Sequence, residues 1–185
     1  MKTKLWKTFL DYEKEEKWLN KMAAKGLAMT AYTFCRYTFE ECIPGEYIYR
    51  IEYLEHNINH PESVRYVRFL SENGVEHVDT YFRWVYFRKK AAEGDFKIYS
   101  DLTSRIKHYQ RISQLWLVIG CMNLFLGLLQ SRIIIQYLTS GPQYWISNAI
   151  IGALSVSLGI ILLTFWWYNN KKIKRLKRER EIHET

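Results

Sequence analysis

Cysteine is scarce in this sequence, which has three residues of this type, Cys35, Cys42 and Cys121, in a chain of 185. Their number is odd and no two form a C-x-x-C pair, so the pattern excludes a disulfide framework and a zinc knuckle. Cys121 also lies within a long apolar segment. We therefore expect three reduced thiols.

Motifs that bind nucleotides or support catalysis are also lacking. The sequence has no phosphate-binding loop and no glycine-rich dinucleotide turn. Glu40 and Glu41 are adjacent on a predicted strand and point to opposite faces, which does not suit paired acid and base chemistry. We predict no catalytic residues, no cofactor and a protein that is not an enzyme.

Two histidines four residues apart, His56 and His60, raise the question of a metal site, with Glu62 nearby. Histidines at this spacing share a metal when both lie on one helix. Here the intervening asparagines and Pro61 place them in a loop before a helix, whose polar start explains them without a metal. We therefore predict no metal site.

A secretory signal is not evident, because residues 1–25 alternate charged residues with isolated apolar ones. We expect the amino terminus to stay in the cytosol. Internal repeats and low-complexity tracts are not evident either.

Long apolar runs, by contrast, are present toward the C-terminus. Residues 112–130 and 145–168 are 19 and 24 residues long. At about 1.5 Å per helical residue, each can cross a hydrocarbon layer of about 30 Å. Lys and Arg flank the pair on both outer sides, whereas the segment between holds only Arg132. Because cytoplasmic flanks collect basic residues, this pattern predicts a transmembrane hairpin in the cell membrane, with both termini cytoplasmic and the loop around residues 139–143 outside.

Half of the net charge of +8 lies in the C-terminal tail. Residues 1–111 carry 19 Lys and Arg against 16 Asp and Glu, and residues 169–185 carry 7 against 3. A basic cytosolic tail of this kind fixes the orientation of the preceding helix and attracts anionic lipid. We therefore predict membrane lipid as a partner, ahead of nucleic acid.

The first 93 residues predict a cytosolic α+β domain. Alternation and helix signals place strands at 5–10, 27–41, 47–54 and 75–90, and helices at 12–25 and 61–73. A change of parity suggests a bend near Cys35, and the last strand is expected to fold once near residues 79–83. The order βαββαβ is that of a ferredoxin-like fold, in which two helices cover one face of an antiparallel sheet.

Residues 94–111 are expected to form a juxtamembrane connector helix. No helix breaker lies between Ser100 and the first apolar segment, so a continuous helix would transmit displacement that a Gly/Ser linker would dissipate. The alternative is that the membrane helix simply starts early.

Several short motifs occur in an order that resembles a known family. They are Trp18-Leu19-Asn20, Arg36-Tyr37-Thr38-Phe39, Pro44-Gly45-Glu46-Tyr47 and Arg83-Trp84-Val85-Tyr86-Phe87-Arg88-Lys89. Over roughly residues 5–111 the sequence is similar to a bacterial, mainly Gram-positive family named domain of unknown function twenty-eight twelve. The resemblance implies a membrane protein whose gene often lies beside a PadR-type transcriptional regulator, and it brings no assigned catalytic residues.

Arginine and aromatic residues interleave on the predicted strands. The set comprises Arg36, Tyr49, Arg50, Arg83, Trp84, Tyr86 and Arg88. Two such strands side by side would form a surface for a protein partner or a planar ligand. The alternative is that the aromatic residues belong to the core and to cross-strand pairs. The glycine-containing signature of RNA-recognition domains is absent, so we predict no nucleic-acid binding.

Small and polar residues in the apolar segments predict how the two helices pack. Asn123 and Ser155 lie at similar depths and are expected to hydrogen-bond across the hairpin, while Gly152 and Gly159 allow close approach. Helix packing is favoured over an ion path, because the two segments contain no acidic residue. A homo-oligomer that encloses a pore remains an alternative.

These features predict a membrane-tethered, non-enzymatic regulatory or sensory module whose cytosolic domain binds a protein partner or a small ligand. Two alternatives remain open. The first is a small transport or envelope-stress component that acts as an oligomeric hairpin, and the second is an enzyme acting at the inner leaflet.

Overall fold

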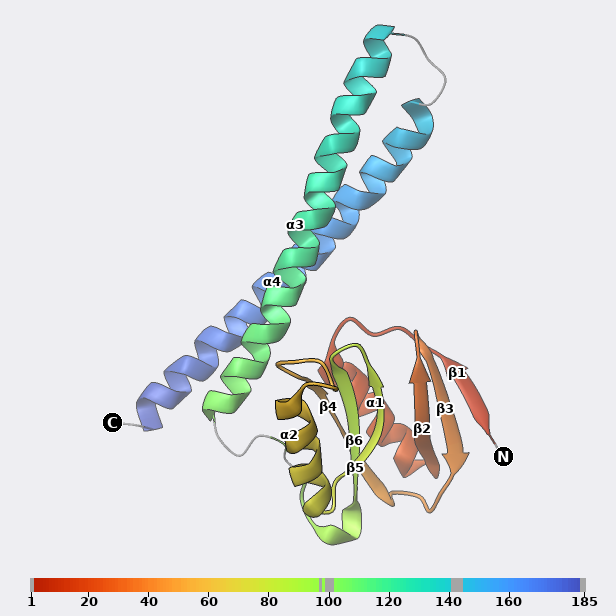
Figure 1. The fold of residues 1–185 in the computed structure, drawn as a ribbon, viewed down its shortest axis with the longest axis vertical. Coiled ribbons are helices and arrows are strands. Elements are labelled where there is room, and N and C mark those ends of the chain that lie inside the picture. Colours follow the sequence, from red (N-terminus) through yellow and green to blue (C-terminus); the bar gives the residue numbers. More distant parts are fainter. Residues whose placement is uncertain (1, 97, 99–101, 141–144, 184–185) are drawn as a thin grey trace. The chain divides into compact units, whose positions relative to one another are not determined.

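The computed structural model describes residues 2–96, 98, 102–140 and 145–183. They form two compact units, Met1–Ser100 and Asp101–Thr185. The chain is an α+β protein, in which the described residues form two three-stranded sheets and two long apolar C-terminal helices (Figure 1).

The first unit consists of two βαββ halves with the same topology. The first half contains β1 (Thr3–Trp6), α1 (Tyr12–Ala24), β2 (Leu27–Thr33) and β3 (Arg36–Glu41). The second half contains β4 (Tyr47–Tyr53), α2 (Pro61–Glu72), β5 (Glu76–Tyr81) and β6 (Trp84–Lys90). Each half forms one antiparallel sheet, in the orders β1-β3-β2 and β4-β6-β5.

The two halves also match in local detail, at a spacing of 48 residues. A bulge in β2 leaves Thr30 without a partner in the register, and the equivalent bulge in β5 does the same to Val78. Gly26 and Gly74 follow the helix of each half, with φ of +80° and +79°. The expectation that the chain lacks an internal repeat is therefore wrong at the level of the fold.

Each long strand predicted from the sequence is in fact a hairpin. Strand 27–41 reverses at Phe34 and Cys35, with φ of +24° and +62°, and strand 75–90 reverses at Phe82, with φ of +55°. These positive φ angles make tight turns without the Gly or Asn that signals a hairpin in a sequence. The bend expected near Cys35 is thus a full reversal, and the fold expected near residues 79–83 is confirmed by the turn at Phe82. The ferredoxin-like βαββαβ topology is not confirmed.

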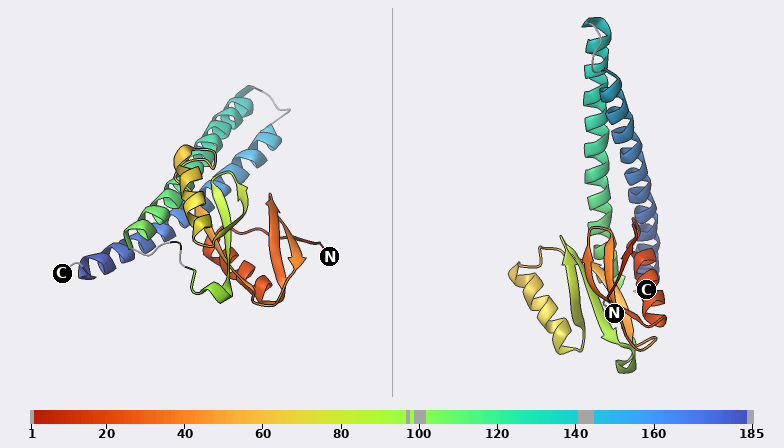
Figure 2. Two further views of the ribbon diagram at one scale, coloured as in Figure 1. Left: turned by 60° about the horizontal axis from the view of Figure 1, so that its bottom comes forward. Right: turned by 90° about the vertical axis from the view of Figure 1, so that its right-hand side faces the viewer.

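The helices α1 and α2 lie against opposite faces of the sheet β4-β6-β5 (Figure 2). Tyr86 of β6 packs in the α1 cluster, whereas its neighbours Val85 and Phe87 pack in the α2 cluster. All three side chains are buried, because alternate residues of a strand face opposite sides. The expectation that both helices cover one face is therefore wrong. Burial of each large side chain stabilises the domain by about 1.5–3 kcal/mol.

The helix boundaries follow from local signals in the sequence. Asp11 caps α1, since its carboxylate accepts a hydrogen bond of 3.0 Å from the backbone N–H of Glu13. Pro61 occupies the first turn of α2, where its missing N–H costs nothing. A short 3-10 helix, Ala91–Glu93, follows β6.

The second unit is an antiparallel pair of helices, α3 (Leu102–Ser140) and α4 (Trp145–His183). Glycines at four positions allow the helices to approach closely. A Cβ on Gly159 would lie 3.1 Å from the carbonyl oxygen of Gly120, and one on Gly127 would lie 3.3 Å from that of Gly152. Gly152 and Gly159 thus lie where close packing was predicted, and Gly120 and Gly127 are their partners on α3.

Asn123 does not make the predicted hydrogen bond to Ser155. Its side-chain amide donates to the carbonyl oxygen of Ile119 in its own helix, at 2.9 Å. This bond satisfies the amide donor within α3, so Asn123 needs no partner on α4. Similar predicted depth in the membrane was therefore not enough to predict a hydrogen bond between Asn123 and Ser155.

Both long helices extend beyond the apolar segments. The last residues of the predicted connector, from Leu102 onward, are continuous with the first apolar segment in α3, and the basic tail continues α4 to His183. The two extensions contact each other, with Lys172 lying 3.5 Å from the Tyr109 hydroxyl. Ser113, at the start of the first apolar segment, also donates to Asn170 of the second extension at 3.1 Å. Residues 141–144, in the loop predicted to lie outside the cell, are outside the described residues.

Candidate functional site

The seven residues predicted to form a binding surface do not share one surface. Tyr49 and Tyr86 are buried, with 0% and 3% of their surface exposed. Trp84 is half-buried, and its ring packs against those of Tyr53 and Tyr12, with centroids 4.9 and 6.0 Å away. The aromatic members of the set therefore serve mainly as core residues.

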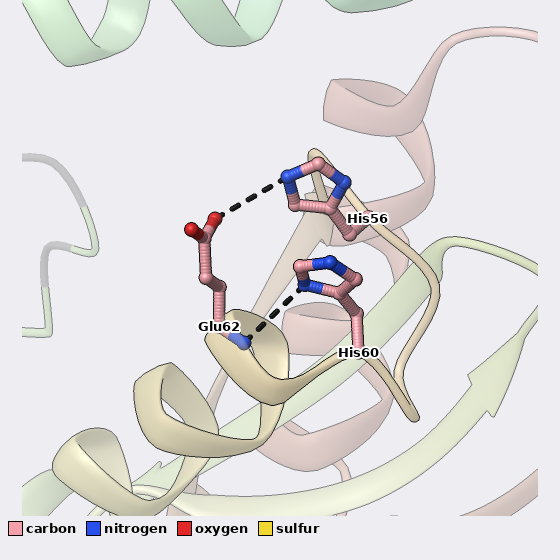
Figure 3. A group of neighbouring side chains, drawn as sticks. All are labelled: His56, His60 and Glu62. Atoms are coloured by element: carbon pink, nitrogen blue, oxygen red, sulfur yellow. Dashed lines mark hydrogen bonds and ion pairs between the residues drawn. The ribbon is translucent and has the colours of Figure 1, made fainter.

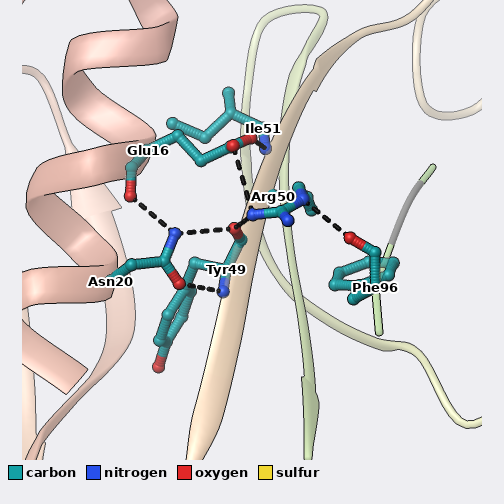
Figure 4. Close-up of polar contacts among 6 residues, drawn as sticks. All are labelled: Glu16, Asn20, Tyr49, Arg50, Ile51 and Phe96. Atoms are coloured by element: carbon teal, nitrogen blue, oxygen red, sulfur yellow. Dashed lines mark hydrogen bonds and ion pairs between the residues drawn. The ribbon is translucent and has the colours of Figure 1, made fainter. Parts of the chain in front are cut away.

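Side chains of α1 complete the free edge of β4 (Figure 4). The Asn20 side-chain oxygen accepts from the backbone N–H of Tyr49 at 2.8 Å, and its amide donates to the Tyr49 carbonyl at 3.1 Å. The Glu16 carboxylate accepts from the N–H of Ile51 at 3.1 Å. These bonds replace those that a neighbouring strand would make, so the edge is already paired at Tyr49 and Ile51.

Arg50 joins this edge to the segment that follows β6. Its Nη1 donates to Glu16 at 3.2 Å, and its Nε donates to the carbonyl oxygen of Phe96 at 2.8 Å (Figure 4). Burial raises the pKa of the Glu16 carboxyl, and the positive charge of Arg50 opposes that shift. The guanidinium is thus engaged in holding three parts of the domain together.

The other arginines of the set also have partners within the domain. Arg83 donates from Nε to the carbonyl oxygen of Leu54 at 2.9 Å and from Nη2 to that of Glu55, and it lies over the Tyr53 ring. Arg88 donates to Glu76 at 2.6 Å and lies over the Tyr47 ring. Arg36 lies over the exposed ring of Trp6, 5.7 Å from its centroid.

The buried carboxyl group of Glu15, on the inner face of α1, connects the two sheets. Its Oε1 accepts hydrogen bonds of 2.7 Å from the hydroxyls of Tyr37 on β3 and Tyr86 on β6. Burial is the largest influence on the Glu15 pKa and raises it, whereas the two hydroxyl donors lower it. Burial and the nearby Glu15 charge raise the pKa of both tyrosines, which keeps them protonated as donors. Sequence patterns gave no signal for this triad, because its members come from three separate elements.

We expect the Glu15→Gln variant to change how stability depends on pH. The raised pKa means that the folded state holds the Glu15 proton more tightly than the unfolded chain, whose value is near 4.5. Wild-type stability should therefore fall as pH rises from about 4.5 through the raised pKa, by up to about 1.4 kcal/mol per pH unit from this group. The variant lacks this loss of stability. The difference in the free energy of unfolding, variant minus wild type, should therefore increase with pH over the same range, as measured by denaturant titrations.

The exposed Glu72 of α2 provides the matched control for this measurement. Titrations of Glu72→Gln correct the comparison for the loss of one surface carboxylate. A Glu15→Gln difference that remains independent of pH after this correction would contradict the assignment of Glu15 as a buried group with a raised pKa.

Exposed aromatic side chains mark a different surface, at the adjacent turns of the two hairpins. Phe34 and Phe82 are 68% and 76% exposed and occupy equivalent positions in the two halves. Tyr81 lies between them, with ring centroids 6.5 Å from Phe34 and 4.8 Å from Phe82. We call Phe34, Tyr81 and Phe82 the aromatic tip. The sequence did not reveal it, because a bend near Cys35 and a fold near residues 79–83 do not show that the two turns lie side by side.

The structure also brings together His56, His60 and Glu62, at the start of α2 (Figure 3). One ligand atom from each lies within 4.8 Å of the others. His60 is the N-cap of α2 and His56 lies in the preceding loop. The prediction that the two histidines precede a helix is confirmed. The loop nevertheless brings their side chains together, although they do not lie on one helix.

Comparison with known proteins identifies a family but no characterised relative. No curated protein and no solved structure matches the chain. A family model described as protein of unknown function (DUF2812) matches residues 11–121, from the N-cap of α1 into α3. The match covers more than half of the chain and includes α1 and β4, which together form the closed edge described above. The chain therefore belongs to the DUF2812 family of proteins of unknown function.

Proposed function

We propose that this protein is a membrane-tethered, non-enzymatic regulatory module whose N-terminal domain binds a protein partner through the aromatic tip. The observation that carries the proposal is the exposure of Phe34 and Phe82, large apolar side chains that contribute little to the core. Exposed apolar clusters of this kind are typical of interaction sites, and aromatic side chains dominate the binding energy of protein interfaces.

The scaffold beneath the aromatic tip supports a binding role because it fixes the two turns side by side. The Asp79 carboxylate of β5 accepts a 2.6 Å hydrogen bond from the backbone N–H of Tyr32 in β2. The rings of Tyr32 and Tyr81 also meet edge to face, with centroids 5.4 Å apart. A preorganised surface loses little conformational entropy on binding, which favours affinity.

The polar interactions of the domain support a binding role over an enzymatic one. Glu15 is used to join the two sheets, and Arg50, Arg83 and Arg88 bind backbone or carboxylate groups of the domain itself. The resemblance to a family whose genes often neighbour PadR-type regulators adds support for a regulatory role.

The two long helices support tethering to the cell membrane. Both are long and apolar enough to span a bilayer, and large apolar side chains on each lie exposed outside the α3–α4 contact. Such side chains are stable where lipid surrounds them. The basic flanks favour both termini in the cytoplasm, with anionic lipid as a partner of the tail. An oligomeric transport role receives less support, because the Asn123 amide is satisfied within its own helix.

Topology can be tested by cysteine labelling of the full-length protein in intact cells. With Cys35, Cys42 and Cys121 replaced by serine, Ser140→Cys should react with a membrane-impermeant maleimide added outside. A cysteine at Lys90 should react only after permeabilisation. External labelling at position 90, or protection at position 140, would contradict the proposed orientation.

The aromatic tip can be tested by placing a photo-crosslinking amino acid at position 82 of the full-length protein in its native host. Irradiation should yield a discrete protein adduct, and Phe34→Ala should lower its yield severalfold. Phe69 on α2 is the matched control, since it is also a phenylalanine with 59% exposure. Equal adducts from positions 69 and 82, or adducts with lipid alone, would overturn a protein-binding tip.

A further inference from the structure

We propose that His56, His60 and Glu62 form a binding site for a divalent transition-metal ion. The three residues span the loop before α2, its N-cap and its first turn, and one ligand atom from each lies within 4.8 Å of the other two (Figure 3). The site shares no residue with the aromatic tip, so the proposal stands independently of the proposed function.

One pair of ligand atoms already has the spacing of two ligands on the same ion. Nε2 of His56 and a carboxylate oxygen of Glu62 are 3.3 Å apart. Two ligands about 2.0–2.1 Å from a tetrahedral ion are about 3.3–3.4 Å apart, whereas charge-assisted hydrogen bonds are shorter, at about 2.7–2.9 Å. This pair therefore needs little movement to share an ion.

The two imidazole rings are stacked, so an ion bound by both requires the rings to rotate until their nitrogen lone pairs, which lie in the ring planes, meet at one point. Their centroids are 4.0 Å apart and their planes differ by 24°. The Nδ1 of His60 accepts a long hydrogen bond, 3.3 Å, from the backbone N–H of Glu62. A metal bound at this nitrogen would replace that weak hydrogen bond, and the backbone N–H of Glu62 could then donate to a water molecule.

The loop that carries His56 is anchored, so the site is partly formed without metal. The hydroxyl of Ser63, which is 5% exposed, donates to the carbonyl oxygen of His56 at 3.3 Å. The N-terminus of a helix disfavours a cation, but the Glu62 carboxylate in the first turn offsets that partial positive charge. Supporting bonds of this kind hold metal ligands in position.

The donor set indicates which ions would bind. Two imidazole nitrogens and one carboxylate oxygen suit Zn²⁺, Ni²⁺, Co²⁺ and Cu²⁺, whereas Mg²⁺ and Ca²⁺ prefer oxygen ligands alone. The side chains of His56 and Glu62 are 40% and 61% exposed, so an ion can enter from solvent. Three protein ligands leave at least one coordination position for water or for a donor from another molecule.

The test uses the full-length chain in detergent, purified without a polyhistidine tag, stripped with a chelator and titrated with Zn²⁺ by calorimetry at pH 7.5. We expect one ion per chain. His60→Asn should weaken binding about tenfold or more, since it removes a ligand but keeps a good N-cap residue. Glu62→Gln should weaken binding in the same direction while leaving both histidines in place.

His77→Asn is the matched control. This exposed histidine on β5 contacts Thr80 at 2.7 Å and lies outside the proposed site, so the substitution should leave the affinity within about twofold of wild type. Co²⁺ should give d–d absorption without the thiolate charge-transfer band that a cysteine site would add. Absence of a one-to-one complex, equal losses from His60→Asn and His77→Asn, or a thiolate band would each overturn the proposal.

Discussion

The closed edge of β4 is the interaction on which the N-terminal domain depends. A strand at the border of a sheet presents unpaired N–H and C=O groups, which attract other strands unless something covers them. Here Asn20 and Glu16 of α1 bind the backbone of Tyr49 and Ile51, so a helix takes the place of a neighbouring strand. The adjacent residue on the same helix, Glu15, binds tyrosines from both sheets. Residues 15–20 of α1 therefore close an edge and join the two βαββ halves.

The sequence predicts the helices well and the sheets only in part. Asp11, Pro61 and the glycines that follow α1 and α2 act locally, so their effects can be read without knowing the fold. The hairpin turn at Phe34–Cys35 is predicted only as a bend, and the one at Phe82 only as a fold near residues 79–83, because neither contains the Gly or Asn that usually permits positive φ. The 48-residue repeat is hidden for a related reason. Equivalent core positions differ in residue type, as with Tyr37 and Val85, while backbone geometry is retained.

The candidate site was predictable only to the extent that its residues act locally. Sequence alternation identifies Arg50, Arg83 and Arg88 as unusual members of strands, but their partners come from distant segments, so their structural roles emerge only from the fold. Phe34 and Phe82 lie outside the core only because the chain reverses at those positions. The histidines illustrate the converse, since the sequence correctly places them in a loop but cannot reveal that the loop stacks their rings.

Hydrogen exchange at individual amides of β4 in the full-length protein tests the central claim most directly. Alternate amides of this strand point toward β6, and those between, including Tyr49 and Ile51, point toward α1. If α1 completes the edge, Tyr49 and Ile51 should exchange as slowly as Arg50, through opening of the domain. Fast, unprotected exchange at Tyr49 and Ile51 beside a protected Arg50 would show an open edge and would contradict the account.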